Sequence, residues 1–555
     1  MLVAEAVGRA LVAAGVDHVF GVVGSGNFHV TNAMVAAGAQ FVASRHEGGG
    51  ATMADAYART SGRPAALTLH QGCGLTNAMT GIAEAAKSRT PLVVVTAEAT
   101  QARSNFYVDQ SGLAAAVGAL ARRVTSAETA VADTVEAVAT AVHQRATVVL
   151  NLPLEIQALE LPDGQSTGRI ELPQAPAPPT PSPTEVERLA ATLSAASRPV
   201  FVAGRGARSH AARDALIALG ERSGALLATS AVAKGLFVGE PFSLDVSGGF
   251  ASPLAAELIH GADLIVGWGC ALNMWTMRHG TLIAPGATVV QVDDTADALG
   301  AHRELAFGVH GDVALTAAAV DEALLEEELG SGAAGRAGYR SPELAARLAR
   351  ELAWRDVPFE DRSTADQIDP RTLTLALDDL LPTQRVVGVD SGNFMGYPSM
   401  FLRVPDERGF CFTQAFQSIG LGLSTTIGAA LAQPDRLPVA AVGDGGLMMS
   451  VAELDTVRRL GLPMVVVVYN DEAYGAEVHH FAPGGHPMET VTFPETDIAA
   501  IARGYGFTGV TVRTTEDLHA VRAWVEGPRD TALLIDAKVR GDQPSWWLEE
   551  AFRGH

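Results

Sequence analysis

The sequence predicts an α/β protein with three doubly wound parallel-sheet domains. Short apolar segments rich in β-branched residues alternate with segments of helical spacing along most of the 555-residue chain. This alternation is typical of parallel strands joined by crossover helices. A chain of this length is too long for one hydrophobic core, and two linker-like stretches divide it. We therefore expect units at residues 1–160, 184–329 and 365–540, followed by a tail at 541–555.

The first unit begins with an amphipathic helix and then alternates strands and helices. Its first strand enters a glycine loop, Gly24-Ser25-Gly26, and a last strand closes the unit. This pitch of alternation fits a parallel sheet with helices between its strands. We expect helices at 3–14, 50–60 and 75–86, and strands at 18–24, 41–44, 65–69, 92–96 and 147–152.

Two linkers and the tail mark the other boundaries. Leu161–Pro183 is dense in proline without periodicity, and Gly330–Gly338 is rich in glycine and alanine. The tail carries Trp546 and Trp547. Because exposed tryptophans are costly, we expect the tail to dock, with a lid over the active site as the functional alternative. We expect strands at 199–203, 264–268 and 288–292 in the second unit, strands at 386–389, 437–442, 464–469 and 532–536 in the third, and a helix at 448–460.

The composition argues against several kinds of partner. The chain is 48% hydrophobic and 18% charged, with a net charge of −22, and has no cluster of Lys or Arg. We therefore expect no nucleic-acid partner and no membrane partner. Cys73, Cys270 and Cys411 lie far apart without metal-binding spacing, which predicts free buried thiols in a reducing compartment. With no leader pattern and no apolar run of membrane-spanning length, we expect a cytoplasmic protein.

Acidic residues follow two neighbouring strands of the third unit. Gly443-Asp444-Gly445 follows the strand at 437–442, and Asn470-Asp471 follows the strand at 464–469. Ligands of open parallel sheets bind at the carboxyl ends of the strands. Carboxylates and free carbonyls are ligands of Mg²⁺, and phosphates usually complete its octahedral shell. The segment predicts a metal-bound diphosphate, although Gly-Asp-Gly by itself also occurs as a plain turn.

This segment resembles the fingerprint of the thiamine diphosphate (ThDP) enzyme family. The order of the three units resembles the acetolactate synthase, benzoylformate decarboxylase and pyruvate oxidase type, with pyrimidine-binding, central and diphosphate-binding domains. The resemblance covers essentially the whole chain and implies ThDP and Mg²⁺, with Asp444, Asp471 and the Ala473 carbonyl as metal ligands. Asp471 departs from the more frequent Asn, as in some catabolic acetolactate synthases. The implied cofactor-binding residues are Glu47, Ser391, Gly392, Asn393, Ile419, Gly443, Asp444, Gly445, Gly446, Asp471, Ala473 and Tyr474.

Glu47 lies in a glycine-rich loop just after a predicted strand. A partly buried carboxyl there is a candidate proton shuttle, and a Glu that caps a helix is the alternative. In the family, the Glu of this motif binds the aminopyrimidine ring and promotes deprotonation of the thiazolium carbon. Family sites pair the first domain of one chain with the third domain of another. The resemblance therefore implies at least a homodimer, with a homotetramer favoured.

Substrate-facing residues are expected at strand ends of the first unit and after the metal loop. Ser25 and His70 resemble residues of benzoylformate decarboxylase; His70 is a candidate general acid/base or, equally, a structural histidine. Gln110 aligns with an acetolactate synthase segment. Pyruvate and indolepyruvate decarboxylases have a Glu in the place of Glu477, although an exposed helix residue is the alternative. We expect Glu47, His70 and Glu477 to be catalytic, and Ser25, His70, Gln110, Ala476, Glu477 and His480 to contact substrate.

The resemblance implies decarboxylation of a 2-oxo acid followed by carboligation to a carbonyl acceptor, as in an acetolactate synthase-like carboligase or lyase. The alternative is a non-oxidative 2-oxo acid decarboxylase. His70 and Glu477 favour that alternative, whereas the missing histidine pair of pyruvate decarboxylase argues against it. A non-catalytic paralogue is disfavoured because Glu47, Asp444 and Asp471 are all present.

Other cofactors have weaker support. The loop Gly204-Arg205-Gly206-Ala207-Arg208 after a strand of the second unit would allow FAD, which is not favoured. An NAD-dependent dehydrogenase is disfavoured because no Gly-x-Gly-x-x-Gly with a downstream acid follows a strand. The missing Gly-Lys-Ser/Thr excludes a P-loop NTPase.

Overall fold

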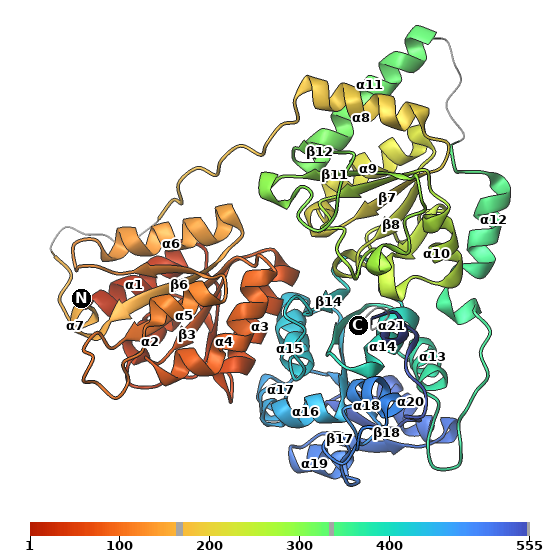
Figure 1. The fold of residues 1–555 in the computed structure, drawn as a ribbon. Helices are drawn as coiled ribbons and strands as arrows, with labels where there is room; N and C mark the ends of the chain where they lie inside the picture. Colours follow the sequence, from red (N-terminus) through yellow and green to blue (C-terminus); the bar gives the residue numbers. More distant parts are fainter. Residues whose placement is uncertain (163–169, 332–337, 552–555) are drawn as a thin grey trace.

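Three α/β domains make up the computed structural model, which describes residues 1–162, 170–331 and 338–551. Figure 1 shows the first domain at the left, the central domain at the top and the third domain at the bottom. Each domain has one six-stranded sheet. All strand pairs in the three sheets are parallel, which confirms the predicted fold class.

The first domain has the strand order β2-β1-β3-β4-β6-β5. Strand β1 ends at Gly21, short of the predicted end at Gly24, because Gly21 has a φ of +142° and turns the chain out of the sheet. Helix α3 begins at Glu47 and not at Gly50. The elements are α1 Val3–Ala13, β1 His18–Gly21, α2 Phe28–Ala36, β2 Gln40–Ala43, α3 Glu47–Ser61, β3 Ala65–Leu69, α4 Cys73–Lys87, β4 Leu92–Glu98, α5 Gln110–Ala116, β5 Leu120–Arg123, α6 Ala130–Gln144, β6 Thr147–Pro153 and α7 Leu154–Gln157.

The central domain has the strand order β12-β11-β10-β7-β8-β9. The strand order reverses between β7 and β10, so the carboxyl ends of these two strands form the switch point of this sheet. The elements are α8 Pro183–Ala195, β7 Pro199–Ala203, α9 His210–Ser223, β8 Leu226–Thr229, β9 Ser243–Val246, α10 Pro253–His260, β10 Leu264–Trp268, β11 Thr288–Asp293, β12 Phe307–His310 and α11 Val313–Ser331.

The third domain has the strand order β14-β13-β15-β16-β18-β17. Strands β15 and β16 lie side by side in its middle. The elements are α12 Pro342–Glu351, α13 Pro370–Leu380, β13 Arg385–Val389, α14 Gly396–Phe401, β14 Phe410–Phe412, α15 Gly422–Ala432, β15 Leu437–Gly443, α16 Asp444–Ser450, α17 Leu454–Leu460, β16 Val465–Asn470, α18 Gly475–Phe481, α19 Ile498–Gly504, β17 Thr508–Val512, α20 His519–Glu526, β18 Leu533–Lys538 and α21 Trp546–Ala551.

The helix predicted at 448–460 is not continuous. Helix α16 already begins at Asp444, and a 3₁₀ turn at Val451–Glu453 separates it from α17. The Ser450 hydroxyl donates to the carbonyls of Gly446 and Leu447, at 3.3 and 3.4 Å. Such bonds back to the preceding turn favour bending of a helix, which gives a physical reason for the break.

The first and third domains share one hydrophobic core. Helix α3 of the first domain packs along α15 of the third (Figure 1), and apolar residues of both domains belong to the same buried cluster. At Gly428 the backbones are so close that a Cβ would lie 2.2 Å from the Met53 carbonyl oxygen. These two domains are therefore held together as one packed unit.

Some sequence predictions fall partly outside the described residues. Residues 163–169 of the first linker, 332–337 of the second and 552–555 of the tail are in this group. Helix α11 runs to Ser331, past the expected start of the second linker. Cys270 and Cys411 are buried, but Cys73 is exposed because it begins α4 at the edge of the sheet, so the prediction of three buried thiols is wrong for Cys73. No helix of the described residues has the length and apolarity needed to span a membrane.

Candidate functional site

The register of β15 and β16 brings the two predicted metal-binding acids to one edge of the third sheet. Gly443 pairs with Tyr469, so Asp444 and Asp471 both leave the sheet at the carboxyl ends of adjacent strands. Asp444 is buried and begins α16, whereas Asp471 lies in the loop before α18. The register of the two strands is therefore enough to place both acidic residues at the same edge of the sheet.

The carboxyls of Asp444 and Asp471 are close enough to share a hydrogen bond. Burial raises the pKa of both groups, and the neighbouring Asp444 raises the pKa of Asp471 further. Ionising both acids in this arrangement costs free energy unless a cation lies between them. The donor set fits Mg²⁺, which prefers carboxylate and carbonyl oxygens.

The loop after β16 is closed by backbone bonds around Ala473. Glu472 adopts a left-handed φ of +58°, and its carbonyl accepts from Phe493 N–H at 2.8 Å. Tyr474 N–H donates to the Val491 carbonyl, also at 2.8 Å. Among the described residues, none of the loop's backbone bonds uses the Ala473 carbonyl, so that oxygen is free to bind a cation. No group of three or more His, Cys, Asp or Glu side chains suited to a metal occurs in the described chain, so diphosphate oxygens would have to complete such a site.

Glycines leave room beside these acids. A Cβ at Gly445 would lie 2.5 Å from the Tyr474 ring, and one at Gly475 would lie 2.3 Å from Asp471 Oδ2. Tyr474 therefore packs directly on Gly445 of the Gly443-Asp444-Gly445-Gly446 turn. The backbone N–H groups of this turn start α16 and are oriented to bind an anion.

Asp390 fixes the segment that carries Ile419. Its buried carboxylate accepts backbone N–H groups of Ser391 at 2.8 Å, Gly420 at 3.0 Å and Leu421 at 3.2 Å. Burial raises the pKa of Asp390 to about 6, although these hydrogen bonds oppose the shift. The sequence pointed to the loop of Ser391 and Gly392, but it did not show that Asp390 is the residue that joins this loop to the Ile419 turn.

The tail docks on the third domain, as predicted. Ser545 N–H donates to Asn393 Oδ1 at 2.8 Å, and the Ser545 hydroxyl donates to the Asn393 carbonyl at 2.6 Å. Trp547 Nε1 donates to the same carbonyl at 2.9 Å. The predicted diphosphate-binding residue Asn393 is therefore held by the tail. Whether the tail also acts as a lid remains a prediction.

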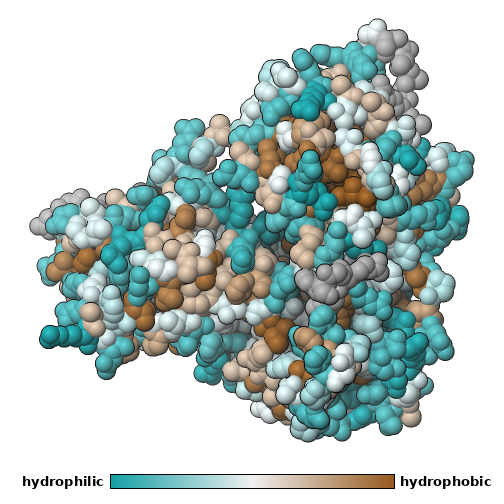
Figure 2. All heavy atoms as spheres, in the orientation of Figure 1, coloured by the Kyte–Doolittle hydropathy of each residue, from teal (hydrophilic) through white to brown (hydrophobic). Residues whose placement is uncertain are grey.

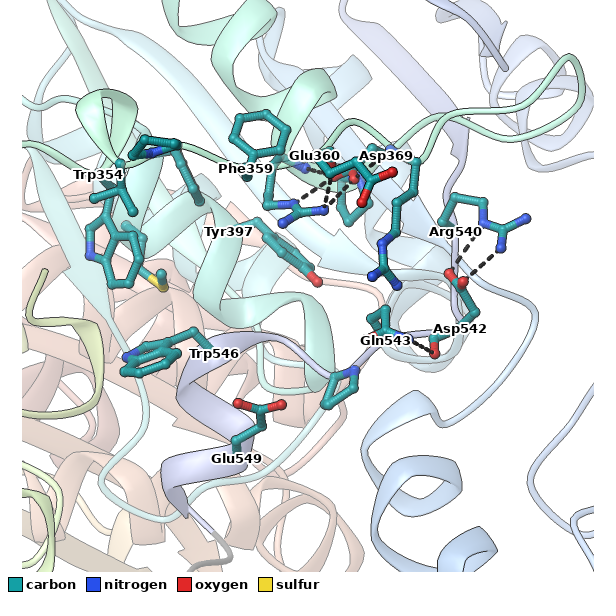
Figure 3. Close-up of a pocket in the computed structure, with 18 residues that line it drawn as sticks. Trp354, Phe359, Glu360, Asp369, Tyr397, Arg540, Asp542, Gln543, Trp546 and Glu549 are labelled. Carbon is teal, nitrogen blue, oxygen red and sulfur yellow. Dashed lines mark hydrogen bonds and ion pairs between the residues drawn. The ribbon is translucent and has the colours of Figure 1, made fainter. Parts of the chain in front are cut away.

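A cavity of about 320 Å³ lies behind this tail. Figure 3 shows Trp354, Phe359 and Tyr397 on one side and the tail residues Asp542 to Glu549 on the other. A Cβ at Gly541 would lie 3.1 Å from the Asp471 Cβ, so the tail passes directly beside the metal loop. The charged groups that line the cavity have both signs, and they do not define one kind of ligand.

In the first domain, Glu47 is the first residue of α3. His46 caps this helix, since its Nδ1 accepts from Gly48 N–H at 3.0 Å. Glu47 is half-buried and its Oε2 accepts from Asn77 Nδ2 at 3.1 Å. Asn77 orients the carboxyl, a role that the sequence did not reveal. Because His46 is the N-cap, the alternative that Glu47 caps the helix is wrong, and the proton-transfer role of Glu47 remains a prediction.

Ser25 and His70 come together across the first sheet. His70 Nδ1 lies 3.0 Å from the Gln71 carbonyl, so Nδ1 carries the hydrogen and Nε2 is left as the acceptor. The Ser25 hydroxyl lies 3.5 Å from that Nε2. Gly24 allows this approach, because a Cβ there would lie 2.5 Å from His70 Cδ2.

Gln110 is fully buried, and its side-chain amide bonds to the turn that follows His70. Its Oε1 accepts from Gly72 N–H at 2.9 Å, and its Nε2 donates to the Ala97 carbonyl and to Asn151 Oδ1, at 3.2 and 2.8 Å. The amide is thus engaged with the protein. Direct contact of Gln110 with substrate remains a prediction.

The residues after the metal loop lie on α18. Glu477 is exposed, while Ala476 and His480 are half-buried and His480 packs edge-on against Phe481. Nε2 of His479 is buried without a hydrogen-bond partner, and burial lowers the pKa of this histidine. The first-domain residues Glu47, Ser25 and His70 and the third-domain pair Asp444–Asp471 are here called half-sites. No hydrogen bond or ion pair among the described residues joins the two groups.

The loop considered for FAD lies at the switch point of the central sheet. Gly206 N–H donates to the Gly269 carbonyl at 3.0 Å, and a Cβ at Gly204 would lie 2.3 Å from that carbonyl oxygen. The glycines therefore serve contact between two protein loops at this position. This packing gives no support to a bound flavin.

Three family models match the chain in the order of its domains. They are the thiamine pyrophosphate enzyme N-terminal TPP binding domain at residues 1–120, the central domain at 186–320 and the C-terminal TPP binding domain at 390–536. The chain belongs to the thiamine diphosphate-dependent enzyme family. Asp444, Asp471 and Ala473 thus lie in the C-terminal ThDP-binding domain of this family, and Glu47 lies in the N-terminal one.

Similar members of the ThDP enzyme family carry several names. Sulfoacetaldehyde acetyltransferase of Rhodobacter capsulatus is 28% identical, covering 100% of this chain and 96% of its own. Acetolactate synthase large subunit of Parasynechococcus marenigrum is 27% identical (95% and 85%), and the probable 2-ketoarginine decarboxylase of Pseudomonas aeruginosa is 28% identical (93% and 89%). A solved Rhodococcus jostii 4-hydroxybenzoylformate decarboxylase has the same fold, with a TM-score of 0.81 at 22% identity over 98% of this chain and 100% of that one.

Proposed function

We propose that this ThDP-dependent enzyme uses Mg²⁺, removes CO₂ from a 2-oxo acid and joins the remaining acyl unit to a carbonyl acceptor. The observation that carries the proposal is the close approach of the carboxyls of buried Asp444 and half-buried Asp471 at adjacent strand ends. A divalent cation bound by both, by the Ala473 carbonyl and by a diphosphate would relieve that contact. Gly445 and Gly446 would bind the diphosphate through backbone N–H groups.

When bound, ThDP supplies a thiazolium carbon that adds to a carbonyl and takes up the electron pair released as CO₂ leaves. Because Asn77 engages Oε2 of Glu47, Oε1 is the oxygen available for proton exchange. His70 Nε2 accepts from the Ser25 hydroxyl, so this pair can deliver or remove a proton at a reacting oxygen. Ile419 would provide an apolar contact for the cofactor.

Two fates of the acyl unit remain in competition. The names of two relatives, an acetyltransferase and an acetolactate synthase, support transfer to an acceptor. Protonation to an aldehyde is the second candidate, favoured by the Ser25–His70 pair and by the exposed Glu477 at the start of α18. The name of a third relative, a 2-ketoarginine decarboxylase, also fits this second candidate.

A complete site would be made by two copies of the chain. Apolar side chains lie exposed beside both half-sites: Val23 and Phe28 flank Ser25, Phe106 packs against His70, and Met449 lies next to Gly420. Figure 2 shows apolar patches between larger hydrophilic areas on one face of the molecule. Exposed apolar patches mark association surfaces, which supports a homodimer at least; a homotetramer and a cytoplasmic location remain predictions.

The decisive experiment is turnover of carbon-13 pyruvate with ThDP and Mg²⁺, followed by NMR with and without an added aldehyde. Labelled acetolactate or a mixed acyloin is the expected result, and Glu47→Gln should abolish it. Acetaldehyde alone would favour the decarboxylase. If pyruvate is untouched, sulfoacetaldehyde and longer 2-oxo acids are the next donors to test. A protein that binds ThDP but turns over none of them would support the non-catalytic alternative.

A further inference from the structure

Two buried carboxylates cross the boundary between the first and third domains. Glu453 of the third domain and Glu84 of the first are 2% and 0% exposed. Each accepts hydrogen bonds from backbone N–H groups of the other domain. In both cases the bonded backbone lies within four residues of a predicted cofactor contact.

Glu453 holds the loop in front of Glu47. Its Oε1 accepts from the backbone N–H groups of Arg45 at 2.9 Å and His46 at 3.0 Å. An ion pair between Arg45 and Asp455 lies next to these bonds. A Cβ at Gly49 would lie 2.5 Å from the same oxygen, so glycine is needed for this approach. The direction in which α3 starts, and with it the position of Glu47, is set by the third domain.

Glu84 holds the loop in front of Ile419. Its carboxylate accepts from the backbone N–H groups of Ala415 at 3.1 Å and Phe416 at 2.7 Å, and also from Arg59 of α3. Beyond this point the chain takes a left-handed φ of +58° at Gln417 before Ile419. Asp390 holds the other side of the turn through Gly420 and Leu421. The turn that carries Ile419 is thus held by two carboxylates, Glu84 of the first domain and Asp390 of the third.

We propose that Glu84 and Glu453 are positioning residues, each of which presents a cofactor-contacting loop of the opposite domain. This inference rests on the proposed function, because it assumes that Glu47 and Ile419 meet ThDP. Neither carboxylate needs to touch cofactor or substrate. Each accepts backbone N–H groups of a loop in the opposite domain and so selects one conformation of that loop.

The test uses Glu453→Ala, Glu84→Ala and the matching Gln variants in the full-length chain. In amide hydrogen exchange without ThDP, Glu453→Ala should speed exchange at Arg45 and His46 about tenfold, and Glu84→Ala should do so at Ala415 and Phe416. ThDP affinity should fall about tenfold in Glu84→Ala, and kcat at saturating ThDP should fall by a similar factor in Glu453→Ala. The Gln variants keep an acceptor oxygen and should stay within about threefold of wild type.

Gly49→Ala and Asp406→Ala complete the design. Gly49→Ala displaces the Glu453 carboxylate without removing it and should reproduce the exchange effect if Glu453→Ala does not fold. Asp406 accepts a backbone N–H and pairs with Arg436 away from both loops, so Asp406→Ala should change none of these readouts. Wild-type exchange in the Ala variants, or Gln variants as impaired as the Ala variants, would overturn the inference. Failure of the wild type to bind ThDP would overturn the proposed function, while the exchange measurement would still test the loop contacts.

Discussion

At the scale of single residues, the site depends on carboxyls that the fold buries. The carboxyls of Asp444 and Asp471 lie close together, and desolvation and mutual repulsion raise the free-energy cost of ionising both. Asp390 is buried as well, but three backbone N–H groups satisfy it. The first pair is suited to bind a cation, and Asp390 is suited to hold a loop.

The acid pair predicts a pH dependence of metal binding. The pKa of Asp471 is raised to about 8, so in the metal-free protein the pair retains a proton at neutral pH. Mg²⁺ must displace that proton, and its affinity should rise with pH by up to about tenfold per unit from pH 6 to 8. Titrations with Mg²⁺ at pH 6, 7 and 8 in the presence of ThDP measure this. Asp471→Asn should flatten the dependence, and an equally flat wild-type response would contradict it.

His70 gives a second prediction at this scale. Because Nδ1 is committed to the Gln71 carbonyl, Nε2 is the atom available for proton transfer. His70→Ala should lower kcat by about 10²-fold while leaving ThDP affinity unchanged. Cys73→Ala, in the same turn, is the matched control and should leave kcat near wild type. Equal loss of ThDP affinity in His70→Ala would instead assign His70 a structural role.

At the scale of elements, the C-terminal segment belongs to the site although it follows the last strand. Its hydrogen bonds converge on Asn393, and its backbone passes beside Asp471. Trp546 has a different role, since its ring packs near Trp354 and Arg278. The two neighbouring tryptophans can therefore be distinguished experimentally.

Trp547→Phe should weaken binding of ThDP and Mg²⁺, because it removes the Nε1 bond to Asn393 while keeping an aromatic ring. We expect a loss of up to about tenfold in affinity, typical of one hydrogen bond to a buried carbonyl. Fluorescence titration with ThDP measures the effect. Trp546→Phe is the matched control and should bind ThDP as wild type does. Similar losses in both variants would show a general weakening of the tail and not a specific contact.

At the scale of the whole molecule, the shared core of the first and third domains keeps the two half-sites of one chain in a fixed relation. They do not meet within the chain by any hydrogen bond or ion pair among the described residues. Their exposed apolar neighbours instead favour a second copy as the missing half.

Complementation tests the two-chain site. Glu47→Gln and Asp444→Asn should each be inactive alone as homodimers. After unfolding and refolding together, half of the dimers should be mixed, and one of the two sites in each should be intact, which restores about a quarter of wild-type activity. Mixing each variant with itself is the control. No recovery on mixing would place the complete site within one chain.

Much of the fold was predictable because it depends on local pattern. The alternation of apolar strands and helices predicted three parallel sheets, and the Gly443-Asp444-Gly445 turn followed from the end of a buried strand. Boundaries were harder. The helix at 448–460 is broken by a serine that bonds back to its own helix, and Cys73 is exposed because of where its helix begins. The domain boundaries and most roles of the site residues remain predictions.

The sequence by itself determined the fold class and the family, and it predicted the residues of a metal-diphosphate site, because strand ends and motif spacing are properties of neighbouring residues. Only the tertiary structure decided which groups hold them. The bonds from Glu84 to Phe416, from Glu453 to His46 and from Ser545 to Asn393 join residues more than 150 positions apart. No local pattern encodes such pairs, because they exist only where segments far apart in the sequence are packed together.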